Sequence, residues 1–245
     1  MTVSLRGSLG VVTRSTTSVT ASSTTGVVGD IVLFAVNGLT GTVSTTTGLT
    51  TPTLLTTLAT FWKFYIATVT ATTWSQIFSG GGNYVSVSWG EFYVSYAATW
   101  ALNLSGASSY TAGANTIPAP SLVDSHADSI YFSAFDSQDN KGGAGTSLAT
   151  IATGFSSSDL TSSGYNQIAI VLGPITPTPD LQFGSSYLNT SANSNVYPAI
   201  TVVASPPAAP SGPRVYSQAV QRASAWMKRE SGLWSPESGL IPRAA

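Results

Sequence analysis

The single histidine of the chain lies between two aspartates at alternate positions, Asp124, His126 and Asp128. On an extended segment this spacing would place one imidazole and two carboxylates on one side, an arrangement that could ligate a divalent metal. A histidine beside a carboxylate could also act as a general base, but no G-x-S-x-G motif accompanies it. We therefore interpret the segment as a polar loop entering a strand at 129–135, with Asp128 bonding nearby backbone amides. The sequence predicts no catalytic residue and no metal site here.

Two other segments have the residue types of known ligand sites but the wrong spacing. The segment 136–145 alternates oxygen donors, yet an EF-type calcium loop needs glycine sixth and an acid twelfth, where this chain has Lys141 and Ser147. The glycine-rich segment 80–84 lacks the helix, lysine and hydroxyl residue of a phosphate cradle. The few acids offer no pair at a spacing that suggests glycoside hydrolysis. We expect no cofactor and no enzymatic activity.

Several aromatic residues lie at positions that core packing does not obviously require. Aromatic faces stack on the apolar faces of sugars in many concave sites. Core packing explains about two thirds of these rings, because large rings are usually mostly buried. We mark Tyr96, Trp100 and Tyr110 as candidate glycan contacts.

The elements that must position these side chains are strands. The chain has 33 Thr and 37 Ser, is 42% hydrophobic and only 8% charged, and has a net charge of −1, a composition that can bury a core. β-branched and aromatic blocks alternate with Gly, Pro, Asn and Ser clusters, which is typical of sheets joined by loops. We predict an all-β fold, a two-sheet antiparallel β-sandwich of jelly-roll-like type. The clearest strand blocks are 27–36, 61–69, 84–89, 91–100, 129–135, 166–173 and 196–204.

The alternation within these blocks predicts which face is buried. In 84–89 the apolar residues occupy odd positions, whereas after Gly90 they occupy even positions. A β-bulge at Gly90 and Glu91 would absorb this slip, and we predict a bulge or bend there. In 61–69 we expect the Trp62 face to be the core and the Lys63 face to be outward.

Absent features exclude further classes. The chain has no cysteine, so it has no disulfide framework and no thiolate metal site. No apolar run approaches the roughly 18–20 residues of a membrane-spanning helix, and the longest, 31–36, has strand length. The N-terminal residues lack a charged region followed by an apolar block, so we expect no export by a signal peptide.

The composition changes near residue 205. Residues 1–209 hold four basic and eight acidic residues, whereas 210–245 hold five basic and two acidic ones, a net charge of +3. We predict a β-sandwich domain at 1–204, a Pro-rich linker at 205–213, and an amphipathic helix with an extended anchoring tail at 214–245. A charge of +3 spread over this length is weak for a nucleic-acid or membrane binder, so we expect docking to a protein instead. The predicted docking residues are Tyr216, Val220, Trp226, Met227, Leu233, Trp234, Leu240 and Ile241.

Residues 5–205 resemble the β-sandwich modules of tail and other virion proteins of bacteriophages, particularly those that infect actinobacteria. The resemblance lies in short segments that recur in the same order. These segments are Gly29-Asp30 leading into IVLFAV, FWKFYIATV at 61–69, the aromatic region 84–100, APSLVDSHADSIYFSAF at 119–135, NQIAIVLG at 166–173 and AITVVAS at 199–205.

The resemblance implies a non-enzymatic structural role in a virion, as a minor tail or fibre component. The partners would be other virion proteins, and trimers are common in phage fibres by analogy. Three alternatives stay open. They are a capsid decoration or head-fibre protein, a carbohydrate-binding module that recognises the host envelope, and a hydrolase acting on cell-wall polymer.

Overall fold

The computed structural model describes most of residues 3–207. The described residues are 3–15, 17–38, 41–59, 61–80, 85–109, 116–118, 120–136, 147–150, 155–159, 166–175, 182–184 and 196–207. The chain divides into two compact units, Met1–Pro207 and Ala208–Ala245. The predicted helix and anchoring tail at 214–245 lie outside the described residues, as does most of the predicted linker.

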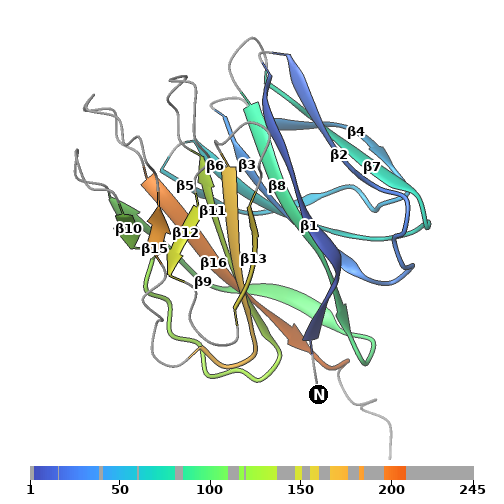
Figure 1. The fold of residues 1–245 in the computed structure, drawn as a ribbon. Helices are drawn as coiled ribbons and strands as arrows, with labels where there is room; N and C mark the ends of the chain where they lie inside the picture. Colours follow the sequence, from blue (N-terminus) through green and yellow to red (C-terminus); the bar gives the residue numbers. More distant parts are fainter. Residues whose placement is uncertain are drawn as a thin grey trace, which may run out of the picture. The chain divides into compact units, whose positions relative to one another are not determined.

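The described residues form strands and no helix, so none of them belongs to a helix that could cross a membrane. The strands form four sheets in which all paired neighbours are antiparallel (Figure 1). The central sheet has the order β1 (Val3–Ser15), β8 (Val85–Val94), β3 (Ile31–Asn37), β6 (Trp62–Thr68), β5 (Thr53–Leu58). The large outer sheet has the order β13 (Phe155–Asp159), β14 (Asn166–Leu172), β11 (Ser129–Asp136), β16 (Val196–Ser205), β9 (Thr99–Ser109). The small outer sheet has the order β2 (Ser18–Ser23), β7 (Trp74–Ser79), β4 (Thr42–Thr47), and a short sheet has the order β10 (Thr116–Pro118), β15 (Gln182–Gly184), β12 (Ser147–Thr150).

Strand β3 shows how the layers are organised. All seven of its residues are buried. Because successive side chains of a strand point to opposite faces, this continuous apolar run must be covered on both sides. Ile31 and Leu33 belong to a first hydrophobic core, whereas Val32 and Phe34 belong to a second. The central sheet therefore lies between two cores.

The first core fills the space between the central sheet and the large outer sheet. Trp62 and Phe64 of β6 are buried in it, as the alternation of the sequence predicted. The ring of Phe132 on β11 meets the rings of Phe64 and Phe92 edge to face, at centroid distances of 6.2 and 6.4 Å. Edge-to-face pairs of this kind stabilise a core beyond the area that they bury.

The second core lies between the central sheet and the small outer sheet. Phe34 contacts Trp74 and Phe78 of β7 at centroid distances of 6.0 and 5.4 Å. The expectation that the Lys63 face of β6 points outward is therefore wrong for most of the strand, because Tyr65 on that face is buried beneath the small outer sheet. Lys63 itself is half-buried, and its Nζ donates a hydrogen bond to the Gly41 carbonyl at 3.1 Å.

The prediction of an antiparallel all-β fold is confirmed, and the structure adds a layer to the two sheets that we expected. The small outer sheet covers a face of the central sheet that a two-sheet arrangement would leave in solvent. In β2 and β4, buried or half-buried positions are interspersed with exposed ones. Thr and Ser residues occupy the exposed positions of these two strands. The Thr-rich segments thus form strands.

The predicted bulge at Gly90 and Glu91 is absent from the pairing of β8 with β3, which runs without interruption through both residues. A register shift is present at this point in the pairing of β8 with its other neighbour, β1. Arg6 pairs with Glu91 and Gly10 pairs with Trp89, so the extra residues are on β1, opposite Gly90. The apolar residues change position along β8 for another reason. Val87 faces the second core, whereas Phe92 faces the first core, so the strand keeps its alternation and changes the core to which it contributes.

Candidate functional site

An open groove of about 500 Å³ lies where the end of β8 meets the turn that enters β3. We call it the aromatic groove; it is lined by residues 27–31 and 93–98, with Thr68 and Trp100. The turn is closed by a hydrogen bond from the Asp30 amide to the Val27 carbonyl at 3.0 Å. Its third residue, Gly29, has φ +97°, a conformation that strongly favours glycine.

Three half-buried aromatic side chains, Tyr93, Tyr96 and Trp100, line this groove. The Tyr96 hydroxyl donates to Asp128 Oδ2 at 3.1 Å and also lies 3.3 Å from the Ala204 carbonyl. Burial, followed by the hydrogen bond to the Asp128 carboxylate and its charge, raises the pKa of Tyr96. The hydroxyl therefore remains a donor at neutral pH, and it attaches the groove to the large outer sheet.

Asp30 lines the groove, and Arg6 pairs with it. Arg6 Nε donates to Asp30 Oδ2 at 2.8 Å, and the guanidinium carbon lies 4.4 Å from the centroid of the Tyr93 ring. Burial raises the pKa of Asp30; the hydrogen bond and charge of Arg6 oppose this effect, and the Glu91 carboxylate adds to it. The Asp30 side chain is 3% exposed and that of Arg6 is 40% exposed, so the arginine connects a buried carboxylate to the surface.

The buried carboxylate of Glu91 also forms a hydrogen bond with this turn. Its Oε1 accepts from the Val27 amide at 2.8 Å, and its Oε2 accepts from Trp74 Nε1 at 3.0 Å. Glu91 also lines a second open groove, of about 640 Å³, together with Arg6, Trp89 and residues 22–25. Glu91 thus ties the turn to the second core.

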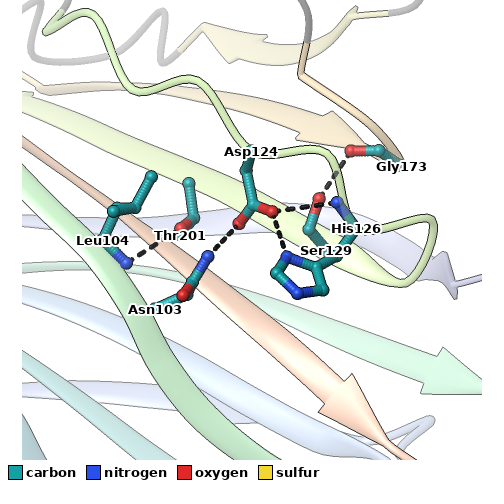
Figure 2. Close-up of polar contacts among 7 residues, drawn as sticks. All are labelled: Asn103, Leu104, Asp124, His126, Ser129, Gly173 and Thr201. Atoms are coloured by element: carbon teal, nitrogen blue, oxygen red, sulfur yellow. Dashed lines mark hydrogen bonds and ion pairs between the residues drawn. The ribbon is translucent and has the colours of Figure 1, made fainter.

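Asp124 is the centre of a separate polar cluster (Figure 2). Its buried carboxylate accepts from Asn103 Nδ2 at 2.9 Å and from the His126 amide at 3.0 Å, and it lies 2.6 Å from His126 Nδ1. Burial alone would raise the pKa of Asp124, but the hydrogen bonds from Asn103, His126 and Thr201 together hold it below its usual value. Its backbone also pairs with Ile175 in both directions, at 3.0 and 2.6 Å. The cluster fastens the segment before β11 to β9, β16 and the end of β14.

The three residues that alternate in the sequence do not share one face. His126 is 56% exposed beside the buried Asp124, whereas Asp128 lies against Tyr96. The Oδ1 atom of Asp128 is buried and has no hydrogen-bond partner among the described residues. Asp128 Oδ2 accepts from the Tyr96 hydroxyl, and the backbone amide of His126 donates to Asp124. In the part of the chain that the structure describes, no group of three His, Cys, Asp or Glu residues is placed to hold a metal ion.

Of the candidate glycan contacts, the structure brings Tyr96 and Trp100 into one groove. Tyr110 lies outside the described residues, as do all the predicted docking residues from Tyr216 to Ile241 and most of the rejected calcium-loop segment. The sequence reasoning missed the lining residues of the turn at 27–30 and the Arg6 side chain that pairs with Asp30 of that turn. The Gly29-Asp30 pair before an apolar strand is a turn signal, but nothing local connects it with Tyr96.

The buried carboxylates of the described residues have structural partners. Asp30, Glu91 and Asp124 accept hydrogen bonds from groups of the chain itself. The aromatic groove instead exposes ring surface and a few polar groups to solvent, a composition suited to holding a ligand. No family model, curated protein or solved structure matches this chain.

Proposed function

We propose that this chain is a non-enzymatic structural protein of a bacteriophage virion, a minor tail or fibre component. It presents a jelly-roll-like β-sandwich domain at the particle surface and is held in the particle by its C-terminal segment. One observation carries the proposal: the segments that resemble virion modules supply most of the buried residues of the first core and part of the second. These segments contain the turn before β3, then β3, β6, β8, β11, β14 and β16.

Two features of the described residues support a role in presentation. Strand β3, at the middle of the central sheet, is buried on both faces, and side chains of the described residues fill both cores. Its buried carboxylates contribute to the structure through hydrogen bonds within the chain. A rigid domain of this kind is suited to displaying a surface.

The C-terminal segment supplies the attachment. Its predicted apolar stripe and its repeated ESGL motif, at 230–233 and 237–240, would dock on another virion protein or on copies of the same chain, as in a trimer. Buried aromatic anchors dominate the energy of many interfaces. Trp226 and Trp234 are therefore the strongest candidates.

Incorporation of variants into particles tests the proposal. In full-length chains, serine at Leu233, Trp234, Leu240 and Ile241 should abolish incorporation without changing the melting temperature of the β domain. Alanine at the exposed Leu54 of β5 is the control and should be incorporated normally. Normal incorporation of the fourfold variant would refute the anchoring role. Immunogold labelling distinguishes the tail location from the alternative of a capsid decoration or head fibre.

A further inference from the structure

The aromatic groove has the size and lining of a site for a small ring-shaped ligand. Its volume of about 500 Å³ lies within the usual range of small-ligand sites, roughly 300–1,000 Å³. Tyr93, Tyr96 and Trp100 line it. Val27 and Val28 also line it, with 39% and 62% of their surface exposed. The lining therefore combines aromatic and aliphatic surface.

Each aromatic ring is held in place by a contact within the domain. Tyr96 is held through its hydroxyl by Asp128, Tyr93 has the Arg6 guanidinium over its ring, and Trp100 packs against the first core. Side chains that are already ordered lose little conformational entropy when a ligand binds. The groove is thus organised before it is occupied.

The charges at the groove favour an uncharged ligand. Asp30 is the one charged residue among those that line it, and Arg6 pairs with that carboxylate at 2.8 Å. The pair leaves no net charge on the wall, so neither an anion nor a cation gains a strong partner. The remaining polar groups are the hydroxyls of Thr68 and Ser95, the tyrosine hydroxyls and backbone amides.

We propose that the aromatic groove binds a neutral saccharide. A pyranose ring stacks its C–H face on Tyr96 or Trp100, while its hydroxyls exchange hydrogen bonds with the polar rim and with water. A purely apolar ligand would leave these polar groups without partners. This inference goes beyond the proposed virion role and does not depend on it.

Glycan-array binding by the purified full-length chain tests the inference, followed by titration calorimetry with a neutral oligosaccharide that binds on the array. Trp100→Ala should weaken binding about tenfold or more, because it removes a stacking surface. Trp100 also packs on the first core, so a second variant is needed that leaves the core intact. Ala97→Arg meets this need because Ala97 is exposed and lines the groove, where a long side chain would occupy the space for the ligand.

Leu54→Ala is the matched control, since Leu54 is 48% exposed on β5 and is not among the groove-lining residues. Loss of binding in both groove variants, with normal binding and an unchanged melting temperature in the control, supports the proposal. The proposal is overturned if the wild-type chain binds no glycan, if it binds only charged glycans, or if Ala97→Arg binds as tightly as the wild type. Because the assay uses the isolated chain, its outcome is independent of particle incorporation.

Discussion

Replacing Asp124 with alanine removes the acceptor that joins the segment before β11 to two strands of the large outer sheet. The Asn103 side-chain amide and the His126 backbone amide would each lose a partner. Hydrogen bonds to a charged group contribute about 1.5–3 kcal/mol each, so the two together contribute about 3–6 kcal/mol. Asn103 and His126 are exposed residues whose donors can bond to water instead, and desolvation of the carboxylate already opposes burial in the wild type. We therefore expect a loss at the lower end of this range, about 3 kcal/mol. The His126 imidazole is 56% exposed and can bond to water, so its lost contact contributes little.

Urea denaturation and thermal melting measure this loss. A chain of this length loses about 2–4 °C of melting temperature per kcal/mol, so Asp124→Ala should melt about 6–12 °C below the wild type. Ser125→Ala changes the exposed neighbouring residue and should stay within about 0.5 kcal/mol of the wild type. His126→Ala should cost less than about 1 kcal/mol.

The pH dependence provides a second measurement of the same cluster. The pKa of Asp124 is lower in the folded chain than the unfolded value of about 3.9. The stabilisation from its ionised form is therefore present above about pH 4 and is lost as the pH falls through the folded pKa. Asp124→Ala should lose less stability than the wild type between pH 4 and pH 2. A loss below about 1 kcal/mol at pH 7, or an unchanged acid limb, would refute the role that we assign to the cluster.

Three further predictions concern Glu91, two glycines with positive φ, and Arg6. Glu91→Ala leaves a buried indole N–H and a turn amide unpaired and should cost about 2–4 kcal/mol in urea denaturation, whereas Glu91→Gln should cost less. Gly48→Ala should destabilise the fold more than Gly29→Ala by melting temperature: both glycines have positive φ, but only at Gly48 would the added Cβ overlap a backbone carbonyl. Arg6→Ala should cost more at pH 7 than at pH 4.5, because the raised pKa of Asp30 lets its unpaired carboxylate take up a proton as the pH falls; equal losses at both pH values would argue against this pairing.

The strand blocks could be read from the sequence because each is a local pattern. The run at 31–36 is apolar at every position, and the structure places it in β3, covered on both faces. The alternation at 61–69 identified Trp62 as a core residue. The covering of Tyr65 could not be predicted in the same way, because it depends on β2, β7 and β4, which lie elsewhere in the chain.

The candidate site, too, could be predicted from the sequence only in part. Tyr96 and Trp100 were recognisable as aromatic residues near the end of a strand block, and the structure places both in one groove. Other lining residues come from the turn at 27–30, and Arg6 of β1 pairs with Asp30 of this turn. Such pairings have no signature in a single segment, since they are set by strand order and register.

The sequence by itself determined that the chain forms strands and where the clearest strand blocks lie, because both follow from side-chain type and local patterning. Only the tertiary structure decided that the central sheet has two cores and that Val87 and Phe92 of one strand face different ones. It also decided which carboxylates became structural acceptors and where aromatic rings remained accessible. The physical reason is that burial and hydrogen bonding depend on groups brought together across long separations, such as the 64 residues between Val27 and Glu91.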